Sequence, residues 1–306
     1  MKTATADDLA RRIVGPVASI PTPFDRDGAI DETGLRSFID FVIEAGACAV
    51  MLTAGDSLMS ILTDREVAQI TRVVADQVRG RAITVAADRS WWVAEEEQFA
   101  VYARDVGADI LMALPPDWAA SCTRQDFVDY YAAVAKHIPV MIVTNVFDAR
   151  GTAFGLETIA QVAHEVPGVC AVKDDVCGQF ARKLATLVHG PWATIAGGQK
   201  QNHMDMLPYG CDAYLSTYIK FAPSVTQRYW AAIQEDRMQD AVDIITRYDM
   251  PFFDFTLALE GGFDAGVHGA LELFGIAGRW RRPPYHSLTD AQMEQLAGFF
   301  HDLELL

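Results

Sequence analysis

The segment GVCAVKDD, Gly168–Asp175, runs five small or apolar residues directly into a lysine and two aspartates. A continuous apolar run of this length is typical of a strand that is buried on both faces of a parallel sheet. Seven further runs have the same character and begin at Val17, Cys48, Ala82, Asp109, Pro139, Ala193 and Asp212. The chain is therefore expected to contain eight parallel strands.

Amphipathic stretches separate these runs, for example residues 31–46 and 63–78. The second stretch opens on Thr63 with Glu66 three residues later, which is the pattern of a capping box at a helix N-terminus. Eight strand and helix units over about 220 residues predict an α/β fold, the (β/α)8 TIM barrel. Residues 1–222 are expected to form the barrel and residues 223–306 a C-terminal helical extension packed on it. A doubly wound open sheet is the alternative, but no GxGxxG follows the first run.

The composition narrows the classes of function. The 306 residues are 51% hydrophobic and 22% charged, with a formal net charge of -16, which argues against a nucleic-acid partner because such proteins need clustered basic surface. No apolar run has the length of a membrane span and residues 1–15 hold no signal-peptide core, so no membrane partner is expected and the protein is expected to be cytoplasmic. The five cysteines are expected to be reduced. No HxxxH or HExxH pair occurs, so neither a metal site nor a cofactor is expected.

The position of Lys173 is informative in such a barrel, because barrel active sites lie at the carboxyl ends of the strands. Lys173 ends the sixth run. The other strand ends contribute hydroxyl, amide, acidic, aromatic and glycine residues, in the segments TPF (22–24), TAGDS (53–57), ADRSWW (87–92), PPDW (115–118), TNVFDARG (144–151), AGG (196–198) and STYIK (216–220). A ring of this composition predicts a site for a small polar ligand.

Several of these segments together resemble one known family. The segments are PTPF at 21–24, the loop with a glycine and an acid at 53–57, NVxxxxG at 145–151, the lysine that ends the sixth run, and GCDAYLS at 210–216. In order and spacing they are similar to the dihydrodipicolinate synthase and N-acetylneuraminate lyase family, over nearly the whole chain. The resemblance implies a class I lyase, either an aldolase or a dehydratase, that forms a Schiff base with pyruvate or a 2-keto-3-deoxy sugar acid. It also implies a homo-oligomer, specifically a tetramer.

Position by position, the resemblance assigns Lys173 as the Schiff-base nucleophile. A lysine attacks a keto group only as the neutral amine, and desolvation at a barrel mouth favours that form. Nearby negative charge opposes it, so Asp174 and Asp175 are expected to point away from the amine or to pair elsewhere. The residues expected to bind the substrate are Thr53, Gly55 and Ser57 for its carboxylate, and Asn145, Arg150, Gly197 and Leu215 around the rest of the molecule.

The main departure from the family lies at Thr144, where the family has a tyrosine that relays the proton. Threonine is shorter and is a far weaker acid, so Thr144 is expected to act as a weak catalytic relay, alone or with water. This loss points away from dihydrodipicolinate synthesis and towards a dehydratase or an aldolase for a sugar-derived 2-keto acid. It also supports an alternative, a non-catalytic member of the fold that binds a keto acid. A metal-dependent aldolase is the least favoured class, because the ligand spacing is absent.

Overall fold

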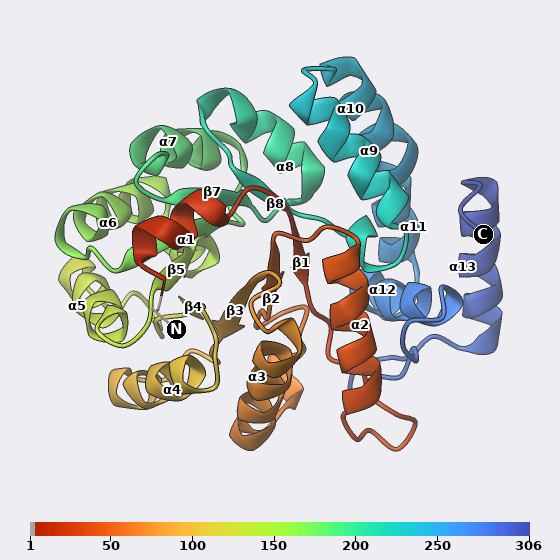
Figure 1. Cartoon of the computed structure of the whole chain (residues 1–306), viewed down its shortest axis with the longest axis horizontal. Helices are drawn as coiled ribbons and strands as arrows, with labels where there is room; N and C mark the ends of the chain where they lie inside the picture. Colours follow the sequence, from red (N-terminus) through yellow and green to blue (C-terminus); the bar gives the residue numbers. More distant parts are fainter. Residues whose placement is uncertain (1–3) are drawn as a thin grey trace.

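Eight parallel strands pair in chain order and close into a barrel, because β8 pairs with β1 as well as with β7 (Figure 1). The computed structural model describes residues 4–306. The strands are β1 (Gly15–Ser19), β2 (Ala49–Met51), β3 (Ile83–Ala87), β4 (Ile110–Ala113), β5 (Val140–Val143), β6 (Val169–Asp174), β7 (Ala193–Ala196) and β8 (Ala213–Leu215). Each strand overlaps one of the eight apolar runs, so the (β/α)8 barrel expected from the sequence is confirmed.

Helices alternate with the strands and form the outer ring of the barrel. A short helix, α1 (Ala6–Arg12), precedes β1. The helices that follow β1 to β7 are α2 (Glu32–Glu44), α3 (Asp64–Val78), α4 (Val93–Asp105), α5 (Arg124–Ala135), α6 (Thr152–Glu165), α7 (Gly178–Val188) and α8 (Gln199–Met206), and α9 (Pro223–Gln234) follows β8. The 3-10 helix η2 (Thr144–Arg150) follows β5 at the barrel mouth. Among residues 4–306, no helix has both the length and the apolar character needed to cross a membrane.

Burial explains why the strands read as continuous apolar runs. Every residue of β1 through β7 is buried, since side chains on one face fill the barrel and those on the other meet the helices. The helix α3 illustrates the outer layer. Its predicted capping box is confirmed, because Thr63 and Glu66 bond each other's backbone N–H groups, and its inner face buries Val67, Ile70 and Val74. Each helix therefore turns one face, repeated every 3.6 residues, towards the strands, whose side chains alternate between the barrel interior and the helices.

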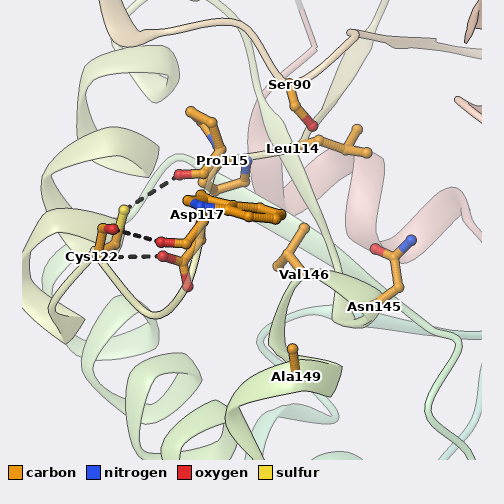
Figure 2. Close-up of a pocket in the computed structure, with 11 residues that line it drawn as sticks. Ser90, Leu114, Pro115, Asp117, Cys122, Asn145, Val146 and Ala149 are labelled. Carbon is orange, nitrogen blue, oxygen red and sulfur yellow. Dashed lines mark hydrogen bonds between the residues drawn. The ribbon is translucent and has the colours of Figure 1, made fainter.

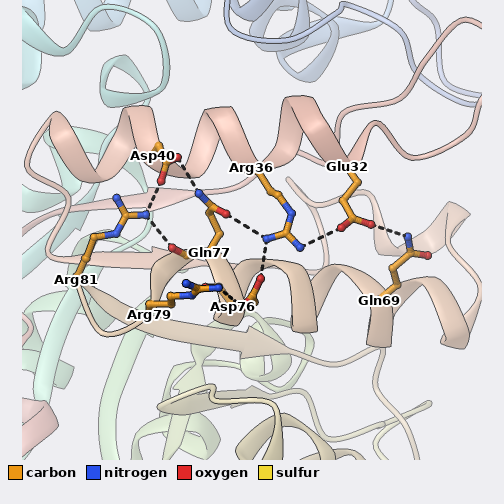
Figure 3. A network of polar contacts seen from close by, with 8 residues as sticks. All are labelled: Glu32, Arg36, Asp40, Gln69, Asp76, Gln77, Arg79 and Arg81. Carbon is orange, nitrogen blue, oxygen red and sulfur yellow. Dashed lines mark hydrogen bonds and ion pairs between the residues drawn. The ribbon is translucent and has the colours of Figure 1, made fainter.

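A polar network also joins α2 and α3 on the outside of the barrel (Figure 3). Arg36 of α2 lies 3.0 Å from Glu32 on its own helix and 2.9 Å from Asp76 of α3. Gln77 of α3 donates a hydrogen bond to Asp40 of α2 at 2.7 Å. These side chains are substantially exposed, so each ion pair contributes at most about 1 kcal/mol. The network therefore bridges two neighbouring helices and adds little to stability.

The C-terminal extension lies on one side of the barrel (Figure 1). It contains α9 (Pro223–Gln234), α10 (Met238–Ile244), a π-helical turn (Ile245–Asp249), α11 (Met250–Ala258), α12 (Gly262–Leu273) and α13 (Asp290–Asp302). Phe221, which closely follows β8, packs against Phe252 and Phe300 of the extension with ring centroids 5.5 Å apart in both pairs. Barrel and extension thus share one hydrophobic core, and the division of the chain at residue 222 stays a prediction.

Candidate active site

Lys173 lies near the carboxyl end of β6, in register with Val143 of β5 and Ile195 of β7. Its side chain is only 8% exposed and borders a cavity of about 250 Å³. The cavity is lined by Thr53, Ala54, Gly55, Asp56, Met112, Leu114, Val143, Asn145, Lys173, Asp175, Gly197 and Leu215. A largely desolvated amine beside a small cavity is an environment in which a lysine can act as a nucleophile.

Lys173 is paired directly with Asp175. The two carboxylate oxygens of Asp175 lie 2.6 and 2.5 Å from Nζ of Lys173. The expectation that both aspartates point away from the amine is therefore wrong for Asp175. Side chains alternate along an extended chain, so residues two positions apart face the same side. Asp175 consequently shares the cavity with Lys173.

Asp174 faces the other way and is fully buried. Its carboxylate accepts hydrogen bonds from the Thr144 hydroxyl, the Asn202 amide and the backbone N–H of Cys177, each at 3.0 Å. Burial raises the pKa of Asp174, and these three donors oppose the rise. Asp174 therefore ties the end of β6 to its neighbours and does not contact the Lys173 amine.

Thr144, the predicted proton relay, opens η2 and is fully buried. Its hydroxyl donates to Asp174 at 3.0 Å and accepts from the backbone N–H of Asp175 at 2.8 Å. Thr144 is not among the residues that line the cavity. A relay through this hydroxyl stays a prediction, while its hydrogen bonds hold the Asp174–Asp175 turn in place.

The loop after β2 is shaped by its hydroxyl groups. Ser57, which was expected to bind substrate, is buried and does not line the cavity: its Oγ donates to the Ile20 carbonyl at 2.6 Å and accepts from the Thr53 N–H at 3.0 Å. Thr53 does line the cavity. No described residue accepts a hydrogen bond from the backbone N–H of Ala54 or of Gly55. The loop therefore offers a hydroxyl and two backbone donors to an anion.

A second buried lysine, Lys220, lies beside this loop, and no role for it was predicted from the sequence. Its Nζ is 2.9 Å from the Asp56 carboxylate, which also accepts a hydrogen bond from Ser19. Burial opposes the charge of Asp56, but Lys220, Ser19 and Lys173 outweigh it and lower the pKa of Asp56 to about 2. The sequence does contain a signal for Lys220, because this lysine ends the segment STYIK, which follows the eighth apolar run.

The remaining predicted residues divide into two groups. Asn145, Gly197 and Leu215 line the cavity, as expected. Arg150 does not line it: its guanidinium bonds Asp117 at 2.6 Å and the Cys122 carbonyl at 2.9 Å. Arg150 lies in η2, and it forms an ion pair with Asp117 in the loop after β4.

Asp117 and Cys122 belong to an open cleft of about 670 Å³ at the barrel mouth (Figure 2). Leu114 and Asn145 line both this cleft and the smaller cavity. Trp118 also lines the cleft, and it is 85% exposed. The small cavity therefore adjoins a larger cleft that is open to solvent.

A closed parallel barrel with a buried lysine at the end of its sixth strand defines a TIM-barrel protein with a lysine-centred site. The chain belongs to the dihydrodipicolinate synthetase family, whose model matches residues 12–302. The family places the protein among lyases, since its relatives are named as dehydratases and synthases.

Two relatives illustrate the range of the family. The chain is 25% identical to a "Probable 5-dehydro-4-deoxyglucarate dehydratase" of Bradyrhizobium sp. (strain ORS 278), over 97% of this chain and 94% of the relative. It is also 25% identical to a 4-hydroxy-tetrahydrodipicolinate synthase of Methanothermobacter thermautotrophicus, over 71% of this chain and 78% of the relative.

Solved structures agree on the fold. A prophage protein of the dihydrodipicolinic acid synthase family from E. coli K12, in complex with pyruvate, has a TM-score of 0.82 at 20% identity, covering 96% of this chain and 99% of that chain. N-acetylneuraminate lyase from Fusobacterium nucleatum has a TM-score of 0.83 at 17% identity, covering 95% of this chain and 99% of that chain. At these identities the likeness concerns the barrel and its extension alone.

Proposed function

We propose that the protein is a class I lyase that forms a Schiff base between Lys173 and a 2-keto acid. One observation carries the proposal: the cavity beside the Lys173 amine is also lined by Thr53, Ala54 and Gly55, and the backbone N–H groups of Ala54 and Gly55 have no acceptor among the described residues. A 2-keto acid carries its carboxylate next to its keto group. A carboxylate bound at this loop would therefore bring the keto carbon towards the lysine.

The chemistry follows from the amine. Neutral Nζ attacks the keto carbon, a C–N bond forms, and the keto oxygen takes up protons and leaves as water. The resulting iminium withdraws electrons from the neighbouring carbon, C3. Loss of a C3 proton, cleavage of the C3–C4 bond or loss of a C4 hydroxyl then becomes easier, which is the common basis of aldolase and dehydratase activity.

For the substrate we propose a sugar-derived 2-keto-3-deoxy acid. The cavity of about 250 Å³ suits the keto-acid end, and the adjoining cleft leaves room for a hydroxylated remainder. A threonine at position 144, in place of the family tyrosine, favours dehydration or aldol cleavage over dihydrodipicolinate synthesis. The relative named as a 5-dehydro-4-deoxyglucarate dehydratase, matched over 97% of this chain, points the same way. Arg150 would meet a distal carboxylate only by leaving Asp117. A cytoplasmic homotetramer stays a prediction.

The alternative is a keto-acid-binding protein without turnover. It is favoured by one observation, the Lys173–Asp175 ion pair, because a carboxylate next to the amine opposes the neutral form that attacks a keto group. A turnover assay separates the two. The protein is incubated with 2-keto-3-deoxy sugar acids, with N-acetylneuraminate, and with pyruvate plus aspartate semialdehyde, and products are followed by mass spectrometry.

We expect a 2-keto-3-deoxy sugar acid to be consumed by the wild-type protein and not by Lys173→Arg. Condensation of pyruvate with aspartate semialdehyde should be at least about 100-fold slower than consumption of the sugar acid. The family tyrosine is absent, and a positioned proton donor commonly contributes about this factor to a rate. Calorimetric binding of pyruvate without consumption of any substrate would favour the alternative, and fast condensation would contradict the proposed substrate.

A further inference from the structure

We propose that Asp175 is the acid–base catalyst of this site and carries the proton at C3 of the keto acid bound to Lys173. The inference rests on the proposed Schiff base and assigns its proton transfer to a residue next to the nucleophile. It gives the site a route for a proton that does not need the family tyrosine.

The position of Asp175 is the first support. Both of its carboxylate oxygens lie within 2.6 Å of Nζ, and its side chain is 25% exposed, so it is in contact with the reacting atom and open to the cavity. C3 of a keto acid bound through C2 is two bonds from Nζ. A carboxylate that contacts Nζ is therefore close enough to reach a C3 proton with a small side-chain rotation.

The second observation is that neighbouring residues hold Asp175 in place. The Thr144 hydroxyl accepts a hydrogen bond from its backbone N–H at 2.8 Å. Gly197 lies directly against it: a Cβ at this position would overlap the Asp175 carboxylate and lie 2.7 Å from the Asp174 carbonyl. Residues that directly follow the two neighbouring strands, β5 and β7, thus position Asp175: Thr144 by a hydrogen bond to its backbone and Gly197 by the absence of a side chain.

The other candidates for the proton are already engaged. Among the residues that line the cavity, the acids are Asp56 and Asp175. Asp56 is bound by Lys220 and Ser19, and these groups lower its pKa to about 2, so it is a weak base. The Thr144 hydroxyl is used by Asp174 and by the backbone of Asp175.

The ammonium of Lys173 gives a proton to the Asp175 carboxylate, and the neutral amine attacks the keto carbon. The oxygen takes that proton and the second proton of the amine nitrogen, and departs as water, which leaves the iminium and a carboxylate. The carboxylate then removes a proton from C3, and the C–H electron pair forms the C2–C3 double bond of the enamine while the iminium electron pair returns to nitrogen. Reversal of this step returns a proton to C3.

The test uses pyruvate in D2O, because exchange of its methyl protons requires the enamine and no second substrate. NMR follows the exchange, and borohydride trapping with intact mass reports the Schiff base separately. We expect the wild-type protein to form the adduct and to exchange the methyl protons. Asp175→Asn should still form the adduct after long incubation but exchange at least about 100-fold more slowly. The matched control is Asp205→Asn, which removes one carboxylate from an ion pair with Arg182 outside the cavity and should match the wild type.

A second variant separates catalysis from positioning. Formate should restore part of the exchange in Asp175→Ala, because a small carboxylate can replace a missing base and cannot replace a structural contact. Unchanged exchange in Asp175→Asn, faster exchange there, or no rescue by formate in a folded Asp175→Ala that forms the adduct would each overturn the assignment. A folded Asp175→Asn that forms no adduct even after long incubation would also overturn the assignment at C3, because the loss of exchange would then follow from the missing Schiff base. A wild-type protein that forms no adduct would instead refute the proposed function itself.

Discussion

The amine of Lys200 lies 2.6 and 2.8 Å from the two carboxylate oxygens of Asp249, and both side chains are buried. Lys200 belongs to α8 of the barrel and Asp249 ends the π-helical turn of the C-terminal extension. The rings of Tyr218 and Tyr229 lie 5.3 and 5.5 Å from the same amine. The extension is therefore joined to the barrel by a buried charge pair as well as by apolar contacts.

Asp249→Asn should destabilise the protein by about 3–5 kcal/mol, because it leaves the Lys200 ammonium buried without a counter-charge. Urea denaturation measures the loss. The double variant Lys200→Met, Asp249→Leu should recover most of it, since an apolar pair needs no charge compensation. Asp205→Asn, in the partly exposed pair with Arg182, should cost less than about 1 kcal/mol. Equal effects of the two single variants would contradict this account of the buried pair.

Glu96 should make the stability of the protein depend on pH. It is fully buried in α4 beside Asp88, and burial followed by the charge of Asp88 raises the pKa of Glu96 far above its usual range. Folded Glu96 then keeps its proton at pH values where the unfolded chain, with an ordinary glutamate, has lost it. Linkage makes this contribution complete below the unfolded pKa of 4.5, and it falls by up to about 1.4 kcal/mol per pH unit above that value.

Between pH 5 and 8, the free energy of unfolding of Glu96→Gln should therefore decrease less than that of the wild type, because glutamine carries no proton to lose. Urea denaturation at several pH values checks this. Glu44→Gln makes the same change at an exposed position and should leave the wild-type slope. A Glu96→Gln variant with the wild-type slope would show that Glu96 is ionised in the folded protein.

Gly197→Ala should displace Asp175, because the new methyl group would overlap its carboxylate. The pyruvate adduct should still form, whereas methyl exchange in D2O should fall about as far as in Asp175→Asn. Gly298→Ala is the control, since its Cβ would meet no atom within 4 Å, and it should exchange normally. Normal exchange in a folded Gly197→Ala would argue against the placement of Asp175.

Thr144 is expected to act as a positioning residue. Thr144→Val removes the donor to Asp174 and the acceptor for the Asp175 N–H, so the exchange rate should fall while the adduct survives. Thr144→Ser keeps the hydroxyl and should restore exchange at nearly unchanged pH dependence. Full exchange in a folded Thr144→Val would contradict this positioning role.

The fold could be predicted from the sequence because the pattern of apolar runs is strong and repeated. Eight apolar runs separated by amphipathic stretches leave few alternatives to a closed barrel, and all eight became strands. The register also brought Lys173 to the barrel mouth, since the lysine ends its run in the sequence. Thr53, Gly55, Asn145, Gly197 and Leu215 then reached the same cavity because parallel strands end at one edge.

The partners of these residues were harder to predict. Ser57 and Arg150 lie near the site but are turned to other acceptors, and such side-chain choices depend on neighbours far along the chain, as in the Arg150–Asp117 pair. The Lys173–Asp175 pair is different, because the alternation of side chains along a strand already places residues 173 and 175 on one face. The charge of Asp175 alone predicts that it avoids the amine, whereas its orientation along the strand places it there.

The central claim is that Lys173 forms a Schiff base with a 2-keto acid, and borohydride reduction in the presence of pyruvate tests it most directly. The account predicts that intact mass spectrometry will detect one reduced pyruvyl group per chain. Peptide mapping should place this group on Lys173, and Lys173→Ala should abolish it. An adduct on Lys220 or on any other lysine, or no adduct with pyruvate and the 2-keto-3-deoxy acids, would contradict the account.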